Sequence, residues 1–187
     1  MKGAIYRQER SGFIRDEGLG LIHVCHGPGV GKTTRSIGLA VRAAGAGLKV
    51  VYVQFLKSGQ SSETVIFASI PNLEYKCPGK HPFILSKGPR EAHYQHAEKA
   101  LGYAREASGA GVDLLVCDEL LSTIFFKVLS EGQILDLMES CRGRVELVLT
   151  GMKAPRRIID AADYVTKFVQ EKHPYYQGHI ARKGIEF

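Results

Sequence analysis

The glycine-rich stretch between residues 26 and 34 says most about this chain, and it reads His26-Gly27-Pro28-Gly29-Val30-Gly31-Lys32-Thr33-Thr34. It follows an apolar run at residues 21–25 that predicts a buried strand. It precedes residues 33–44, whose apolar positions recur at helical spacing. A strand, a glycine-rich loop, a Lys-Thr pair and a helix in this order are typical of a P-loop, which surrounds phosphates with backbone N–H groups. The stretch therefore predicts a nucleoside triphosphate site.

The roles of individual P-loop residues follow from phosphate chemistry. Lys32 is expected to reach the terminal phosphates, and the Thr33 hydroxyl is expected to bind Mg²⁺ or Mn²⁺. The usual first glycine, five positions before Gly31, is replaced by His26. The alternative is a glycine-rich turn without a ligand, which the flanking strand and helix make the weaker interpretation. The predicted nucleotide-binding residues are Gly27, Pro28, Gly29, Val30, Gly31, Lys32, Thr33 and Thr34.

Composition places the chain among ordinary globular proteins. It has 187 residues, of which 44% are hydrophobic, and a formal net charge of +6. No apolar run approaches the roughly 18–20 residues of a membrane span, and the first residues lack the apolar core of a secretory signal. We therefore expect a cytoplasmic protein without a membrane partner, in which Cys25 and Cys117 are buried thiols. The basic balance fits a polyanionic ligand, but no nucleic-acid motif accompanies it, so we expect no nucleic-acid partner.

Strand-like and helix-like segments alternate along the chain. This alternation predicts an α/β fold, a P-loop NTPase-like three-layer sandwich with a mostly parallel central sheet. We expect one domain over residues 1–187, with an N-terminal tail at 1–18 and a C-terminal tail at 171–187. Further strands are expected at residues 50–55, 73–76, 112–118, 145–151 and 163–168. Helices are expected at 90–108, at 130–138 after a Ser130 cap, and from Pro155, with long loops at 56–72 and 77–89.

A second set of candidate residues lies at the end of the strand at 112–118. Asp118-Glu119 would supply hard oxygen ligands for the metal that Thr33 also contacts, although a surface acid that caps the next segment is the plainer alternative. No residue stands out to aim water at the γ-phosphate. His93 and His96 are three positions apart on a predicted helix and could share a metal, but solvated helix histidines are far commoner. His173 could line a pocket, or it is simply a turn residue before a proline.

Five blocks of this sequence resemble one family, the ATP:corrinoid adenosyltransferases, over about residues 19–187. That family's modified P-loop also lacks the first glycine. The tail is the most discriminating block, because P-loops are widespread and this ending is not. The blocks are the P-loop itself, Arg42-Ala43-Ala44-Gly45-Ala46-Gly47, Val53-Gln54-Phe55-Leu56-Lys57-Ser58-Gly59, Asp118-Glu119-Leu120, and a tail that begins Glu171-Lys172-His173-Pro174-Tyr175-Tyr176-Gln177-Gly178 and ends Ala181-Arg182-Lys183-Gly184-Ile185-Glu186-Phe187.

The resemblance implies an unusual reaction. Reduced cobalt, Co(I), in a corrinoid would attack the 5′-carbon of ATP, and triphosphate would leave, so no residue is needed to activate water. It further implies a corrinoid substrate, an electron donor such as a reduced flavoprotein, and a homodimer. By resemblance, the catalytic residues are Lys32, Thr33 and Glu119. Thr33 and Glu119 would hold the metal, and Asp118 would orient them through hydrogen bonds. The residues expected near the substrates are Gln54, Lys57, Glu63 and His173, and Phe83 is expected against the corrin face.

The sequence also departs from the family pattern. Val30 replaces a lysine beside the phosphates, Met152 replaces an arginine, and Ile180 stands near the place of a tail lysine. Pro28 replaces an asparagine or aspartate, and Leu85 stands near the place of a tryptophan found in some members. Three basic residues could restore the lost charge, namely Lys153, Arg156 and Arg157. Two alternative functions remain open from sequence: a P-loop kinase or hydrolase acting on a small molecule, and a non-catalytic corrinoid- or nucleotide-binding protein. A nucleic-acid-binding ATPase is a more distant third.

Overall fold

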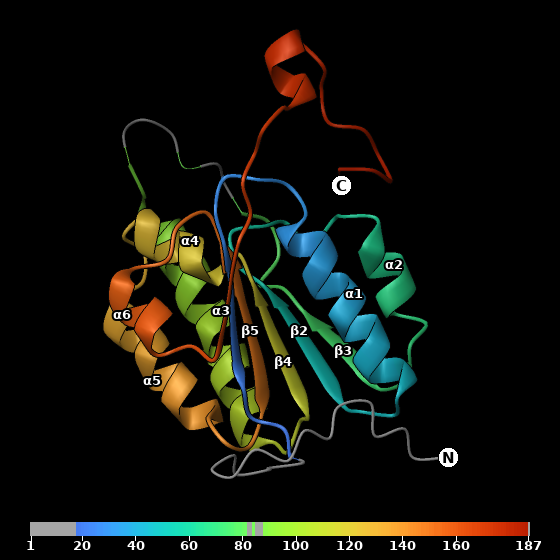
Figure 1. The fold of residues 1–187 in the computed structure, drawn as a ribbon, viewed down its shortest axis with the longest axis vertical. Coiled ribbons are helices and arrows are strands. Elements are labelled where there is room, and N and C mark those ends of the chain that lie inside the picture. The colour runs from blue at the N-terminus through green and yellow to red at the C-terminus, as the bar shows by residue number, and fades with distance from the viewer. Residues whose placement is uncertain (1–17, 82–83, 85–87, 187) are drawn as a thin grey trace, which may run out of the picture.

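A six-stranded parallel sheet forms the centre of the molecule (Figure 1). The computed structural model describes residues 18–81, 84 and 88–186. Within them the strand order is β3-β2-β4-β5-β1-β6, and every strand pair is parallel. The strands are β1 (Ile22–His26), β2 (Val50–Gln54), β3 (Leu73–Lys76), β4 (Leu114–Asp118), β5 (Glu146–Gly151) and β6 (Tyr164–Lys167). The prediction of an α/β fold with a mostly parallel sheet is confirmed.

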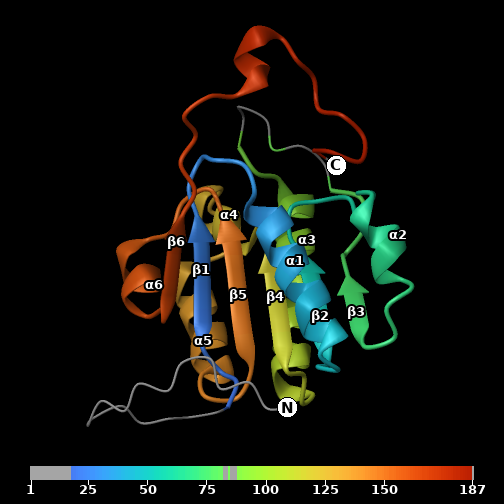
Figure 2. The ribbon, with the colours of Figure 1, turned by 45° about the vertical axis from the view of Figure 1, so that its right-hand side comes forward.

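Helices cover both faces of the sheet and make it the middle of three layers (Figure 2). One face packs against α1 (Lys32–Gly45) and α2 (Glu63–Phe67). The other face packs against the remaining α-helices: α3 (Glu91–Gly109), α4 (Leu120–Phe125), α5 (Glu131–Cys141) and α6 (Arg156–Asp160). A 3₁₀ turn, η1 (Pro174–Gln177), lies in the C-terminal tail. The three-layer sandwich predicted from the alternating sequence is therefore confirmed.

The central strands are buried on both faces because their successive side chains enter different layers of the core. Val51 and Val53 belong to the cluster shared with α3 and α5, whereas Val50 and Tyr52 belong to the cluster shared with α1. In a sheet with one face in solvent, apolar and polar residues would alternate along each strand. Here both faces are covered, so the residues of the central strands are mostly apolar. This explains why the sequence shows short continuous apolar runs rather than alternation.

Two helices and the character of one strand were not predicted correctly. Helix α2 falls where the sequence analysis expected a loop, and α4 falls in a segment for which it predicted no element, because helices of five or six residues are too short to show periodicity. Strand β6 was expected to be a core strand, and this was wrong. It lies at the sheet edge beside β1, so Tyr164 and Val165 are 51% and 44% exposed.

Other local expectations hold. Ser130 caps α5: its hydroxyl accepts a hydrogen bond from the backbone N–H of Gln133, and the Gln133 side-chain oxygen accepts one from the backbone N–H of Ser130. Cys25 and Cys117 are buried thiols, as expected. Of the helices that the structure describes, none is both long and apolar enough to cross a membrane. The predicted N-terminal tail lies almost wholly outside the described residues.

Candidate nucleotide and metal site

The P-loop connects β1 to α1 at the carboxyl end of the sheet and is held by the backbone of its neighbours. Gly27 N–H donates to the Met152 carbonyl at 3.1 Å, and Gly29 N–H donates to the Phe168 carbonyl at 3.0 Å. A Cβ on Gly27 would lie 2.2 Å from the Phe168 carbonyl oxygen, and one on Gly29 would lie 2.7 Å from that of Val169. Only glycine fits at these two positions, because the chain that follows β6 passes directly against the loop.

The N-terminus of α1 is open to an anion. Gly31 precedes the helix with φ of 102° and makes no side-chain cap, and the first turn carries no acidic residue among the residues that the structure describes. The N–H groups of the first turn and the partial positive charge of the helix are therefore available to phosphate oxygens. The Lys32 ammonium donates to the carbonyls of Gly27 at 2.8 Å and Gly29 at 2.6 Å, so it lies across the mouth of the loop.

Burial also affects the charge of Lys32. It lowers the pKa of this lysine from its usual value, the Glu119 and Asp118 carboxylates act against that lowering, and the Lys57 ammonium adds to it. Two lysines therefore face two carboxylates at the mouth of the loop. A bound triphosphate would place negative charge beside Lys32, where these lysines could neutralise it.

Asp118, at the end of β4, is the centre of a polar network opposite the P-loop. Its carboxylate is fully buried and accepts hydrogen bonds from the Thr33 hydroxyl at 3.0 Å, the Thr150 hydroxyl at 2.7 Å and the Lys57 ammonium at 2.7 Å. Glu119 instead accepts a hydrogen bond from the Ser122 hydroxyl at 2.5 Å. The structure therefore brings Asp118, rather than Glu119, into direct contact with Thr33.

Two non-glycine residues next to this network have a left-handed backbone conformation, which turns the chain at the end of a strand. Leu56 follows β2 with φ of 55°, and Glu119 follows β4 with φ of 64°. Each such conformation costs on the order of 1 kcal/mol or more and persists only where surrounding contacts fix it. The Thr150 hydroxyl fixes Glu119 by accepting its backbone N–H at 2.8 Å. Strain at two adjacent strand ends is the kind that accumulates at functional sites.

Three of the four residues that the family resemblance placed near the substrates, Gln54, Lys57 and Glu63, lie close together. Gln54 donates to the Glu63 carboxylate at 3.3 Å and accepts from the Tyr75 hydroxyl at 2.7 Å. Lys57 completes the group through its ion pair with Asp118. Burial acts to lower the pKa of Lys57, but Asp118, Glu119 and Glu63 outweigh it, so the pKa rises above its usual value. The lysine is therefore fully protonated at neutral pH.

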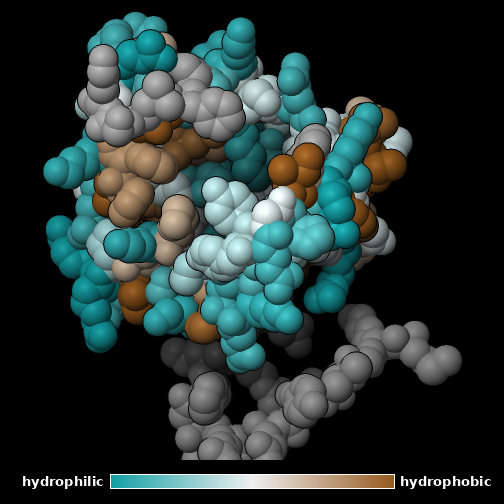
Figure 3. Space-filling model, turned by 90° about the horizontal axis from the view of Figure 1, so that it is seen from above, coloured by the Kyte–Doolittle hydropathy of each residue, from teal (hydrophilic) through white to brown (hydrophobic). Residues whose placement is uncertain are grey.

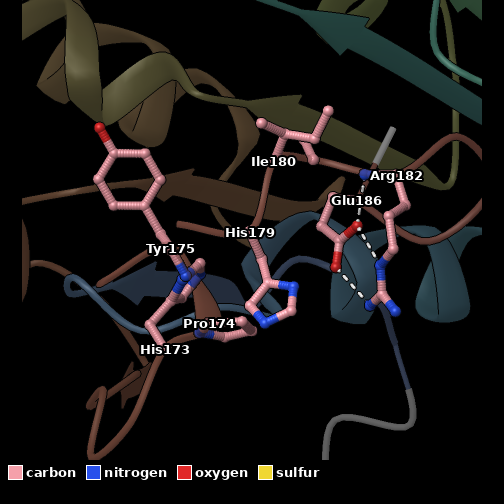
Figure 4. A pocket seen from close by; sticks show the side chains of 8 residues that line it. His173, Pro174, Tyr175, His179, Ile180, Arg182 and Glu186 are labelled. Carbon is pink, nitrogen blue, oxygen red and sulfur yellow. Dashed lines mark hydrogen bonds and ion pairs between the residues drawn. The ribbon is translucent and has the colours of Figure 1, made fainter. Parts of the chain in front are cut away.

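His173 lies in the C-terminal tail, and Phe83 lies outside the described residues. The His173 ring accepts a hydrogen bond from the backbone N–H of Tyr175 at 3.1 Å and borders a hollow of about 220 Å³ formed by the tail itself (Figure 4). An ion pair between Arg182 and Glu186 closes one side of this hollow and lowers the pKa of Glu186 to about 2. The tail extends beyond the carboxyl ends of the strands, on the same end of the molecule as the P-loop (Figure 1).

Surface character at this end is mixed. Seen from above in Figure 3, hydrophilic residues predominate, and hydrophobic residues gather on two sides. The tail contributes apolar area, since Tyr175 and Tyr176 are 71% and 79% exposed. Val30 and Met152, which replace basic residues of the family pattern, are also exposed. The three basic residues that could compensate have other partners: Lys153 lies over the Phe125 ring, Arg156 pairs with Asp160, and Arg157 pairs with Glu131.

The two helix histidines differ from expectation. His93 and His96 were expected to be solvated, but both are buried and face His81 from the loop after β3. His96 Nε2 lies 3.1 Å from the Gly79 carbonyl, and His93 Nδ1 accepts from the Arg90 N–H at 2.6 Å. Burial and the two neighbouring histidines lower the pKa of His81 to about 4. No group of three His, Cys, Asp or Glu side chains among the described residues is arranged to hold a metal.

Sequence reasoning missed two residues that organise the acidic pair. Thr150 joins Asp118 to the backbone of Glu119, and Ser122 joins the Glu119 side chain to the backbone N–H of Met152 at 3.1 Å. The available signal was the position of Thr150 at the carboxyl end of a predicted strand, where parallel strands assemble ligand sites. Nothing in the local sequence around Ser122 distinguishes it from an ordinary helix serine.

A P-loop at one strand end and an acidic pair at another, on a parallel sheet covered by helices on both faces, define a nucleotide-binding α/β protein of the P-loop class. The sequence comparison is more specific. Residues 18–187 match the family described as ATP:corrinoid adenosyltransferase BtuR/CobO/CobP. This chain belongs to that family.

Individual relatives agree with the assignment. A corrinoid adenosyltransferase of Pseudomonas aeruginosa is 31% identical, and the match covers 97% of this chain and 94% of that protein. The corrinoid adenosyltransferase CobA of Salmonella typhimurium is 28% identical, over 90% of this chain and 86% of that protein. Among solved structures, the flagellar accessory protein FlaH of Methanocaldococcus jannaschii is 13% identical, with a TM-score of 0.48 over 79% of this chain and 70% of that one.

Proposed function

We propose that this protein transfers the 5′-deoxyadenosyl group of ATP to the Co(I) of a reduced corrinoid and thereby contributes to adenosylcobalamin synthesis or salvage. The observation that carries the proposal is the match of residues 18–187 to the corrinoid adenosyltransferase family. In this reaction Co(I) supplies the electron pair of the new Co–C5′ bond. The C5′–O bond breaks, and its electron pair leaves on the triphosphate.

The protein's contribution is to bind and to position. The α1 N-terminus, the P-loop amides and Lys32 would hold the triphosphate and stabilise the negative charge that develops on it as it leaves. Because Co(I) is itself a strong nucleophile, no protein side chain has to remove a proton. Holding C5′ in line with cobalt and keeping water away are then sufficient tasks for the site.

We propose that Mg²⁺ or Mn²⁺ accompanies ATP, held by the Thr33 hydroxyl, Asp118 and Glu119. The donor set fits such an ion, since it offers hard oxygen atoms and already holds a cation, the Lys57 ammonium, 2.7 Å from Asp118. The ion would add positive charge beside the leaving triphosphate. Glu119→Gln and Asp118→Asn should each raise the metal concentration that half-maximal activity requires. A metal dependence equal to that of the parent would remove the substituted residue from the ligand set.

Further parts of the proposal concern partners and location. The exposed tyrosines of the tail and the hydrophobic groups at the carboxyl end would suit the faces of a corrin ring. A reduced flavoprotein is a suitable class of electron donor for producing Co(I). We also propose a homodimer in the cytoplasm. Size-exclusion chromatography with light scattering, and fractionation of cells, test these two statements directly.

The decisive experiment follows the fate of the phosphates. The protein is supplied with ATP, Mg²⁺ and chemically reduced cobalamin, and the products are analysed for light-sensitive adenosylcobalamin and for inorganic phosphates. We expect inorganic triphosphate in step with adenosylated product, and little turnover of ATP without the corrinoid. Release of orthophosphate at roughly 1 s⁻¹ or faster without the corrinoid would instead identify a kinase- or hydrolase-like enzyme.

The same assay examines the non-catalytic alternative. Tight binding of ATP and corrinoid with neither product would favour a binding protein that has lost turnover. The exposed positions Val30 and Met152 are then the first to change, because each replaces a basic residue of the family pattern. The Val30→Lys, Met152→Arg double variant should restore transfer. A double variant that binds both substrates and remains inactive would move the defect elsewhere in the site.

A further inference from the structure

A lysine side chain lies on the oxygen atoms that a divalent metal would need. The Lys57 ammonium is 2.7 Å from Asp118 Oδ2 and 3.3 Å from Thr33 Oγ1. The Asp118 side chain is fully buried, whereas that of Lys57 is 31% exposed. A buried carboxylate without a neighbouring cation is costly, so the lysine neutralises Asp118 while no other cation is present.

The backbone of this lysine is fixed while its ammonium can leave. Leu56 holds a left-handed conformation that turns the chain sharply after β2. The Cys77 thiol donates to the Lys57 carbonyl at 3.3 Å and ties this turn to the loop after β3. Four flexible methylene groups then separate an anchored backbone from a partly solvated ammonium. Displacement of the charge therefore requires rotation of one side chain and no movement of the sheet.

We propose that Lys57 is an exchangeable stand-in cation, whose ammonium holds the metal position between Thr33 and Asp118 until the metal arrives with its triphosphate. This inference rests on the proposed function. Thr33 and Asp118 would then hold the ion through their oxygen atoms, and the displaced ammonium of Lys57 would turn to the phosphates that entered with the ion. Lys57 would thus carry its charge from Asp118 to the leaving triphosphate.

The exchange makes the metal and the nucleotide dependent on each other. A metal ion alone must displace Lys57 into water, where the ammonium gains no new partner. A metal ion accompanied by triphosphate displaces it onto an anion. Metal should therefore bind weakly without ATP and much more tightly with it. A purely structural ion pair predicts the opposite for a variant, since loss of Lys57 would disturb the site and weaken metal binding.

The test measures binding of Mn²⁺ alone by electron paramagnetic resonance, which reports the free ion. Lys57→Met keeps the length of the side chain and removes its charge. We expect it to bind Mn²⁺ roughly tenfold more tightly than the parent in the absence of ATP, because the competing ammonium is gone. The matched control is Lys76→Met, which removes a lysine that pairs with Glu74 and Glu106 on the surface and should leave Mn²⁺ affinity unchanged.

Thermal unfolding and a second variant show whether a change in Mn²⁺ affinity comes from the lost charge or from a folding defect. Lys57→Met should melt below the parent without metal, and Mn²⁺ alone should raise its midpoint by more than it raises the parent's. Lys57→Gln, whose side chain can donate a hydrogen bond to Asp118, should show the same two changes in smaller size. Mn²⁺ affinity equal to or weaker than the parent's, in whichever of the two variants folds, would overturn the proposal.

The same preparations separate this inference from the proposed function. Adenosyl transfer by the parent, combined with unchanged Mn²⁺ affinity in the variants, overturns the exchange and leaves the function standing. Tighter Mn²⁺ binding in the variants, combined with no adenosyl transfer by the parent, supports the exchange and overturns the function. ATP should also strengthen Mn²⁺ binding more in the parent than in Lys57→Met, because only the parent has an ammonium to relocate.

Discussion

Replacing Thr150 by valine tests the network that holds the two acidic residues. The Thr150 hydroxyl is fully buried, donates to Asp118 Oδ1 at 2.7 Å and accepts the Glu119 N–H at 2.8 Å. Valine keeps the shape of threonine and removes both contacts. A hydrogen bond to a charged acceptor is worth about 1.5–3 kcal/mol, and an orphaned buried N–H costs about 1–3 kcal/mol.

These two losses overlap, because Asp118 Oδ1 keeps its contact with the Thr33 hydroxyl at 3.0 Å. We therefore expect Thr150→Val to lower the free energy of unfolding by about 3 kcal/mol, towards the lower part of the summed range. Thr150→Ser keeps the hydroxyl and loses one methyl group, which should cost about 1 kcal/mol. The comparison isolates the hydroxyl from the packing of the side chain.

Urea unfolding followed by circular dichroism measures both variants against the parent, with equal slopes showing that only stability has changed. Adenosyl transfer should also fall in Thr150→Val and persist in Thr150→Ser, since Glu119 depends on this hydroxyl for its left-handed backbone. Thr150→Val within about 0.5 kcal/mol of Thr150→Ser would refute the reasoning, because a difference that small is ordinary for a substitution without a specific role.

Three further outcomes are expected. Lys32→Ala should weaken ATP binding by about 1.5–3 kcal/mol and abolish transfer, as isothermal titration and the adenosylation assay would show; unchanged affinity would remove Lys32 from the phosphate site. Gly29→Ala should abolish ATP binding, because its Cβ would lie 2.7 Å from the Val169 carbonyl, whereas the control Gly38→Ala, with nothing within 4 Å, should bind ATP normally and be slightly more stable. The pKa of His81 is lowered from 6.5 to about 4, so between these values the unfolded chain binds a proton that the folded protein does not. The contribution of His81 to the free energy of unfolding should therefore be fully present above about pH 6.5 and be lost as the pH falls towards 4. His81→Asn should reduce this loss in urea titrations, and an equal loss in both proteins would contradict the assignment.

Local patterns in the sequence determined the elements of this protein. The P-loop, the buried strands and the longer helices are encoded by the identity and spacing of neighbouring residues, so each was predicted to within a few residues. The glycines of the loop are a particular case. Their backbone freedom is visible in sequence, and the closeness of the Phe168 backbone in the structure explains why the freedom is needed.

Tertiary structure alone decided the order of the strands and everything that depends on it. Thr33 and Lys57 meet Asp118 from 85 and 61 positions earlier in the chain, and Thr150 reaches it from 32 positions further along. Propensity and periodicity act over a few residues and contain no information about such distances. Crossover connections place these strand ends side by side, and only then does a lysine in a loop become the partner of a buried carboxylate. The same reason made β6 an exposed edge and placed His93 in the interior, since burial depends on which element covers a residue.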